Sequence, residues 1–239
     1  MDTTDPLAAH LPPPTAARPL LGLTVLVVED SRFACEALRL LCLRSGARIR
    51  RADCLKSARR HLQVYRPTVL IVDLGLPDGS GLELIDELTD AQSRVEALIA
   101  MSGDTHLEAA AIAAGADGFL AKPITSIAAF QDRVLTLLPA ERRPKGPRTI
   151  DTTEVTPDIL AYQDDIAHVA GLLESGHNGR TLDYIAQFIG GVAKSAADVP
   201  LEKAALALAK RLAQGETTLS ETALIADMIK TRLSRPMAI

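Results

Sequence analysis

The chain has 239 residues, of which 47% are hydrophobic, and this is enough for one large or two small domains with a sizeable core. Its 30 acidic side chains outnumber its 26 Lys and Arg, and a formal net charge of −4 gives no general attraction to nucleic acid. No apolar run approaches the roughly 20 residues that cross a bilayer, so we expect no membrane insertion. Three cysteines fit small buried side chains in a reducing cytoplasm better than a disulfide framework, and we expect a cytoplasmic protein.

The N-terminal segment differs from the rest of the chain in composition. Residues 1–19 are rich in Pro, Ala and Thr, and they lack the basic start and apolar centre of a signal peptide. We predict a disordered extension over residues 1–19, followed by a first domain over residues 20–139.

Strand and helix patterns alternate through this first domain. The expected strands cover residues 23–28, 47–51, 69–73, 95–101 and 118–121. The expected helices follow them, with Ser31 capping the first and Gly46 ending it, and the later ones covering residues 55–65, 82–88, 107–114 and 127–138. Alternation with apolar, buried-type strands indicates an α/β fold, in which a doubly wound parallel sheet is covered on both faces.

Reactive side chains follow these strands where the strands end. Glu29 and Asp30 come after the first strand, Asp73 closes the third, and Ser102 and Lys122 follow the fourth and fifth. Ligands of doubly wound sheets bind outside the carboxyl ends of the strands. The sequence therefore predicts one functional site, which all five residues share.

The residue types define the chemistry expected at this site. Glu29, Asp30 and Asp73 would bring three carboxylates together, and such a cluster requires a cation. Oxygen ligands without His or Cys suit Mg²⁺, which also binds phosphate oxygens. Asp73 can then accept a phosphoryl group as a nucleophile, with the Lys122 ammonium and the Ser102 hydroxyl stabilising the phosphoryl oxygens.

These motifs resemble those of a known family. VLVVEDS, VLIVDLGLPDGSG, LIAMSG and GADGFLAKP are similar to the motifs of receiver domains in bacterial two-component response regulators, and the resemblance covers residues 21–138. It implies a flavodoxin-like five-stranded parallel sheet with strand order 2-1-3-4-5. It also implies phosphorylation of Asp73 by a partner histidine kinase or phosphotransfer protein.

The resemblance assigns further roles residue by residue. The backbone carbonyl of Gly75 would complete the Mg²⁺ ligands, Ser102 would move to bind the phosphoryl group, and Phe119 would fill the aromatic switch position. The bond between Lys122 and Pro123 resembles one that is cis in the family. The protein would accept and lose a phosphoryl group by self-catalysis, without being an enzyme in the usual sense.

A basic, proline-rich linker is predicted over residues 140–156. Arg142, Arg143, Lys145 and Arg148 lie among prolines without any periodicity, which is typical of an exposed and fairly stiff segment. Its charges are either solvated or form a docking strip for an acidic partner.

The remainder, residues 157–239, has only helical periodicity. Apolar side chains step by three and four along successive stretches, with short breaks near residues 176–179, 199–200 and 215–218. Short connections favour antiparallel neighbours, so we predict an all-α helical bundle that serves output or dimerisation. Its wide apolar stripes could pair two chains as a homodimer.

Three functions remain open for this helical domain. The first is interaction with an output protein, controlled through repacking of the face between Leu107 and Leu138. The second is DNA binding, since residues 185–195 faintly resemble a helix-turn-helix, although twelve Asp and Glu against eight Lys and Arg from residue 150 onward oppose it. The third is histidine phosphotransfer through His168 or His177. Neither histidine has the expected sequence context, and we assign no site to them.

Overall fold

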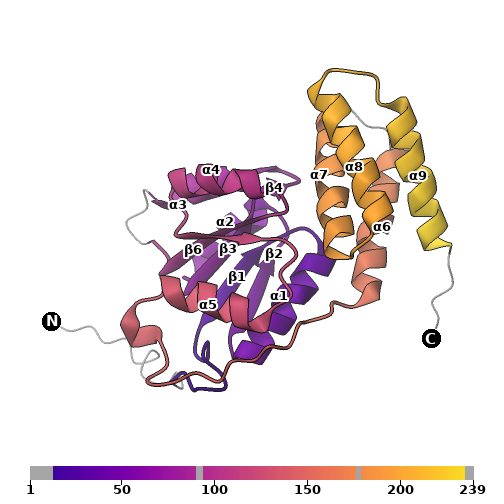
Figure 1. The fold of residues 1–239 in the computed structure, drawn as a ribbon. Helices are drawn as coiled ribbons and strands as arrows, with labels where there is room; N and C mark the ends of the chain where they lie inside the picture. The colour runs from indigo at the N-terminus through magenta and orange to yellow at the C-terminus, as the bar shows by residue number, and fades with distance from the viewer. Residues whose placement is uncertain (1–12, 90–93, 176–178, 235–239) are drawn as a thin grey trace.

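The structure, a computed structural model, describes residues 13–89, 94–175 and 179–234. Two parts follow one another along the chain: a sheet with helices on both faces, and a separate group of helices (Figure 1). Within the described residues, 13–19 contain no helix or strand, and residues 1–12 of the predicted extension lie outside them. No helix of the described residues is long and apolar enough to span a membrane.

The first part is a parallel sheet whose strands follow the predicted segments within a few residues. The described strands are β1 Thr24–Val28, β2 Arg48–Ala52, β3 Val69–Asp73, β6 Ala97–Ser102 and β7 Gly118–Ala121. They lie in the order β2-β1-β3-β6-β7, and every neighbouring pair is parallel. Once a small hairpin of β4 Gly75–Leu76 and β5 Gly79–Ser80 is set aside, this is the predicted order 2-1-3-4-5, which is confirmed.

Helices cover both faces of this sheet. They are α1 Arg32–Ser45, α2 Leu55–Val64, α3 Gly81–Thr89, α4 Glu108–Ala113 and α5 Ile127–Leu137, with short 3₁₀ turns at Thr105–Leu107 and Ala140–Arg142. The Ser31 hydroxyl accepts from the backbone N–H of Ala34 and so caps α1 as predicted. Gly46 ends α1 in the left-handed region at φ 89°, which a side chain would strain.

Alternate strand residues enter two separate cores. Val25, Val27, Ile71 and Ile99 pack with α1 and α5 on one face, whereas Leu26, Val28, Leu70, Val72 and Leu98 pack with α2, α3 and α4 on the other. Full burial of one such aliphatic side chain is worth about 1.5–3 kcal/mol, so the strands are fixed strongly in register. The loops at the ends of the strands therefore stand on a rigid base.

The second part is a helical bundle with its own core. Its helices are α6 Ile159–Glu174, α7 Gly179–Ser195, α8 Val199–Ala213 and α9 Leu219–Leu233. Each of these helices packs on the next along the chain, and α9 closes the bundle against α6. The predicted all-α bundle is confirmed for the described residues. Residues 185–195 lie within the single helix α7, so the segment that resembled a helix-turn-helix contains no turn.

The segment between the two parts runs along the sheet domain. Arg142 forms an ion pair with Glu96 at 2.7 Å, Arg143 donates to the carbonyl of Leu138 at the end of α5, and Arg148 pairs with Asp132. Val155 is buried in the α1–α5 core. Three of the arginines that could have formed a docking strip are therefore engaged by the sheet domain. The domain boundaries themselves stay predictions.

The helical part packs beside the strand ends of the sheet domain. Its helices α6 and α7 lie against α1, and α7 also contacts the β4 hairpin (Figure 1). Phe33 of α1 enters the core of the bundle and packs edge-on against Tyr162 at a centroid distance of 6.0 Å. In this structure α1 provides the main contact with the helical part. Repacking of the face between Leu107 and Leu138 after phosphorylation, against another receiver or the helical part, stays a prediction.

Candidate functional site

The predicted site residues lie together at one edge of the sheet. Glu29 and Asp30 leave β1, Asp73 closes β3, Ser102 closes β6, and Lys122 follows β7. These strands are neighbours and parallel, so their carboxyl ends meet at the same edge. Glu29, Asp73 and Lys122 are buried there together with the hydroxyl of Ser102. Burial is unusual for charged side chains and indicates a functional site.

Three carboxylates form the acidic cluster of this site. One oxygen from each of Glu29, Asp30 and Asp73 lies within 4.8 Å of the others. Two unit charges about 4 Å apart repel by roughly 4 kcal/mol at an effective dielectric constant of about 20. This repulsion requires compensating positive charge.

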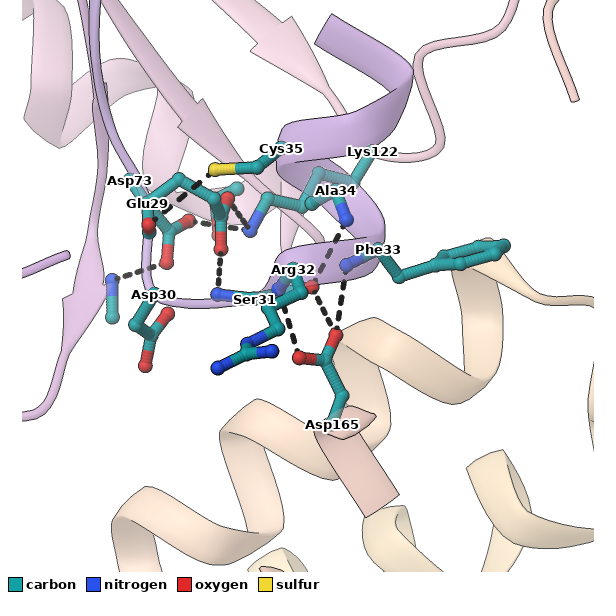
Figure 2. A network of polar contacts seen from close by, with 12 residues as sticks. Glu29, Asp30, Ser31, Arg32, Phe33, Ala34, Cys35, Asp73, Lys122 and Asp165 are labelled. Atoms are coloured by element: carbon teal, nitrogen blue, oxygen red, sulfur yellow. Dashed lines mark hydrogen bonds and ion pairs between the residues drawn. The ribbon is translucent and has the colours of Figure 1, made fainter. Parts of the chain in front are cut away.

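Lys122 supplies part of that charge. Its ammonium lies 2.6 Å from a carboxylate oxygen of Glu29 and 2.9 Å from one of Asp73 (Figure 2). Glu29 also accepts from the backbone N–H of Ser31 at 3.0 Å. One ammonium facing three carboxylates leaves an excess of negative charge. The donor set of buried carboxylate oxygens therefore fits a hard divalent cation such as Mg²⁺.

The site perturbs the protonation of its own groups. Burial raises the pKa of Glu29 to about 7, against the opposing effect of the Lys122 charge. Burial likewise raises the pKa of Asp30 to about 6 and that of Asp73 to about 7. Burial alone would lower the pKa of Lys122, but the charges of Asp73 and Glu29 raise it above its ordinary value. A bound cation would favour the ionised carboxylates.

In the absence of Mg²⁺, we expect the free energy of unfolding to fall as the pH rises from about 4 to about 7. The folded-state pKa values of Glu29 and Asp73, about 7, lie above the values near 4 of an unfolded chain. The unfolded chain therefore releases these protons first, and stability decreases across that window. Denaturant titrations at a series of pH values measure the slope. Glu29→Gln and, separately, added Mg²⁺ should reduce it; a slope unchanged by both would place its origin elsewhere.

The other predicted residues take the following places. The Ser102 hydroxyl accepts from the backbone N–H of Asp104 at 3.1 Å, and the Gly75 N–H donates to Asp73 at 3.3 Å. Phe119 is buried in the core on the α2–α4 side of the sheet. The bond between Lys122 and Pro123 is cis, as predicted.

Residues of the helical part also reach this edge, and their contacts were not among the sequence-based predictions. The Tyr184 hydroxyl of α7 donates to Asp30 at 2.6 Å, and the Lys194 ammonium donates to the carbonyl of Gly103 at 2.8 Å. Tyr184, Gln187, Gly191 and Lys194 follow one another at intervals of three and four on one helix. Such spacing places these polar and small residues on one face of the helix. That face was the sequence signal from which a contact with another surface could have been predicted.

A buried acid of α6 holds the start of α1. Asp165 accepts from the backbone N–H groups of Arg32 and Phe33 at 2.8 and 3.0 Å, and from the Ser31 hydroxyl at 2.7 Å (Figure 2). A carboxylate at a helix N-terminus satisfies unpaired N–H groups and is favoured by the helix dipole. Asp164 adds an exposed ion pair with Arg32. The helical part is therefore anchored directly beside Asp30.

A cavity of about 530 Å³ lies between the two parts. It is lined at one end by Asp73, Ser102 and Lys122, and at the other by residues of α7 and α8. Volumes of this size are typical of small-ligand sites. The edge of the sheet that carries Asp73 therefore borders a cavity of ligand size, although α7 lies across it.

Comparisons with known proteins identify the first part. Residues 25–134 match the response regulator receiver domain, and this part of the chain is a receiver domain. The chain is 30% identical over 138 residues to the KDP operon transcriptional regulatory protein KdpE of Escherichia coli, which covers 57% of this chain and 61% of that protein. It is 32% identical over 107 residues to the transcriptional regulatory protein CitB of Klebsiella pneumoniae, covering 43% and 45%. The chain thus spans less than two thirds of the length of either relative.

Solved structures align with about half of the chain. A response regulator from Chloroflexus aurantiacus is 27% identical, with a TM-score of 0.46, and the alignment covers 48% of this chain and 96% of that one. The response regulator protein TrrA of Thermotoga maritima, solved in complex with Mg²⁺ and beryllofluoride, is 23% identical with a TM-score of 0.45, and the alignment covers 48% and 99%.

Proposed function

We propose that this protein is a cytoplasmic two-component response regulator whose Asp73 accepts a phosphoryl group from the phosphohistidine of a partner kinase or phosphotransfer protein. The observation that carries this proposal is the cluster of Glu29, Asp30 and Asp73, in which one oxygen of each side chain lies within 4.8 Å of the others. Lys122 forms ion pairs with Glu29 and Asp73 of this cluster. Phosphoryl transfer needs a positioned nucleophile and charge neutralisation, and this edge supplies both.

The side chains divide the work of the transfer. An oxygen of Asp73 attacks phosphorus, so a P–O bond forms while the P–N bond of the donor breaks and its electron pair leaves with the imidazole nitrogen. Lys122 is placed to neutralise a phosphoryl oxygen, and the hydroxyl of Ser102 donates to another. Glu29, Asp30, Asp73 and the carbonyl of Gly75 would hold Mg²⁺, which neutralises charge on the phosphoryl group when bound.

Phosphorylation would act as a switch through residues beside the acceptor. We propose that Ser102 and the loop after it move toward the phosphoryl group, and that Phe119 adjusts its packing in response. The change is a shift between two states that already exist, because the ligand binds one of them better. The helical domain then carries the message to an output protein or to a second copy of the chain.

Removal of the divalent cation should slow phosphorylation strongly. With a small phosphodonor such as phosphoramidate, a chelator should lower the initial rate of labelling by about 100-fold, since charge neutralisation by a metal ion contributes several kcal/mol. The rate is read from the phosphorylated fraction by intact-mass measurement. Added Mg²⁺ should restore it. A chelator without effect would contradict the proposed chemistry.

DNA binding is the alternative output, and the description of both relatives as transcriptional regulatory proteins favours it. The acidic balance from residue 150 onward, twelve against eight, opposes it, because DNA readers present a basic face to the phosphates. A salt-dependent DNA mobility shift that disappears on deletion of residues 150–239 would favour this alternative over protein interaction.

A further inference from the structure

We propose that one face of α7 is docked on the edge of the sheet that carries Asp73 in the unphosphorylated protein. This face is released when Asp73 receives its phosphoryl group. This α7 docking face consists of Tyr184, Gln187, Gly191 and Lys194. The proposal rests on the proposed function of Asp73, and it adds the route by which the signal reaches the helical domain. Two of the three contacts of this face meet proposed cation ligands, Asp30 and Gly75, and the third meets Gly103, which directly follows Ser102.

The first contact is on the acidic cluster. The Tyr184 hydroxyl donates to a carboxylate oxygen of Asp30 at 2.6 Å, a short hydrogen bond to a charged acceptor. Tyr184 is only partly exposed and its ring packs against Phe188 of the same helix at 5.6 Å, which limits its freedom. A cation held by Asp30 would compete with this hydrogen bond for the Asp30 carboxylate. Occupation of the site therefore weakens this contact.

The second contact lies beside the acceptor itself. A Cβ added to Gly75 would be 2.3 Å from Nε2 of Gln187, so the amide of Gln187 lies directly on the backbone two residues after Asp73. No side chain other than hydrogen fits at position 75 without displacing Gln187. A movement of the loop at Gly75, whose carbonyl would bind the cation, would therefore change its contact with Gln187 of α7.

The third contact is on the loop that would move. The Lys194 ammonium donates to the carbonyl of Gly103 at 2.8 Å, and a Cβ added to Gly103 would lie 3.8 Å from Cα of Gly191. A separation of 3.8 Å is ordinary van der Waals contact, so the loop after Ser102 lies against α7 here. Gly103 directly follows Ser102. When Ser102 moves toward a phosphoryl group, the carbonyl of Gly103 moves with it and leaves Lys194.

A second set of contacts between the two parts does not involve Asp73 directly. Asp165 and Asp164 of α6 hold the start of α1, and this anchor is independent of Asp73. The α7 docking face can therefore separate by a tilt of the bundle about the anchor. Release exposes Tyr184, Gln187 and Lys194 together, and this surface becomes available to the output partner.

Linkage sets the reciprocal expectation. If phosphoryl binding weakens the docking of α7 by some factor, docking weakens phosphoryl binding by the same factor, so a variant that docks less must bind the phosphoryl group more tightly. Lys194→Ala removes a docking contact without touching Asp73, the acidic cluster or Lys122. The variant should bind beryllofluoride, a phosphoryl mimic, about fivefold more tightly in the presence of Mg²⁺, which falls in the usual range of coupling between sites.

The experiment uses the full chain and two readouts. Calorimetry gives the affinity for Mg²⁺–beryllofluoride of the wild type, Lys194→Ala and the control Lys210→Ala, which changes an exposed lysine of α8. Fluorotyrosine labelling gives the second readout, because the chain has only three tyrosines and their ¹⁹F signals can be assigned by Tyr→Phe variants. A soluble paramagnetic agent should broaden the Tyr184 signal more after beryllofluoride is added. Tyr162, which is bonded to Asp198 inside the bundle, should not change.

The outcomes separate the two proposals. Tighter binding by Lys194→Ala together with exposure of Tyr184 supports release of α7. Equal affinities for wild type and Lys194→Ala, with Tyr184 as protected as before, would overturn the release while leaving Asp73 as acceptor. A wild type that binds no beryllofluoride with Mg²⁺ would instead overturn the proposed function. Mg²⁺ alone serves as the reference state, so that direct effects of the cation on Asp30 are not mistaken for release.

Discussion

Asp73→Asn is expected to reduce phosphoryl labelling to about 1% of the wild-type level or below, because an amide has no nucleophilic oxygen of comparable strength. The substitution keeps the size of the side chain, so the N–H of Gly75 still finds an oxygen acceptor. Lys122 keeps its 2.6 Å ion pair with Glu29. Loss of labelling would therefore report on chemistry and not on a collapse of the site.

Stability measurements provide the check on that interpretation. Burial raises the pKa of Asp73 to about 7, which means that its ionised form is poorly accommodated without a cation. We expect Asp73→Asn to unfold at the same or a higher denaturant concentration than the wild type. Asp132→Asn, an exposed acid of α5 in the same domain, serves as the matched control and should label within about twofold of wild type. Full labelling of Asp73→Asn would place the acceptor at another residue.

Much of the receiver fold was predictable because its elements are encoded locally. The run from Val69 to Val72 is buried on both faces. Four consecutive apolar residues of this kind are typical of an interior strand of a parallel sheet. Ser31 and Gly46 set the ends of α1 through cap geometry that depends only on neighbouring residues. The gathering of the site then follows from topology, since parallel strands bring their carboxyl ends to one edge.

The contact between the two parts was not predictable by the same means. The pattern of α7 defines an apolar side for the bundle, but it does not say which surface its polar stripe meets. One signal was present in α6: Asp165 lies among Tyr162, Ile166 and Val169 on the buried side of the helix. A buried acid needs a partner that donates hydrogen bonds, and the N-terminus of another helix provides one. Which helix does so depends on tertiary packing alone.

The linker illustrates the same limit. Its arginines have no periodicity, and a prediction of exposed charges follows from composition. Their ion pairs with Glu96 and Asp132 join residues that are distant in sequence. The β4 hairpin was also missed, since two-residue strands are too short to leave a pattern. Ion-pair partners that are distant in sequence are brought together only by the complete fold, and no local pattern identifies them.

Lys122→Met should have the largest effect on stability. The ammonium of Lys122 pairs with both Glu29 and Asp73, and all three side chains are buried. Methionine fills a similar volume but leaves two carboxylates without their cation. Removal of one partner from a buried ion pair costs about 3–5 kcal/mol, and we expect a loss of that size at pH 8 without Mg²⁺. Lys203→Met, at an exposed position of α8, should change stability by less than about 0.5 kcal/mol.

The pH dependence of this loss tests its origin. Without Lys122, the pKa values of Glu29 and Asp73 would lie still further above those of the unfolded chain, since the ammonium lowers both. Groups with raised folded-state pKa values bind protons more tightly in the folded state, so stability is regained as the pH falls. The deficit of Lys122→Met relative to wild type should therefore shrink between pH 8 and about pH 5.

Mg²⁺ should restore part of the stability of Lys122→Met at pH 8, because a ligand that binds only the folded state stabilises it by mass action. Phosphoryl labelling should stay low even then, because the positive charge that neutralises a phosphoryl oxygen is missing. Recovery of stability without recovery of labelling would distinguish the two roles of Lys122, which are to compensate the charges of Glu29 and Asp73 and to neutralise a phosphoryl oxygen. A variant whose deficit is the same at both pH values and in Mg²⁺ would have lost packing and not charge compensation, and Lys122 would then be a structural residue of the loop after β7.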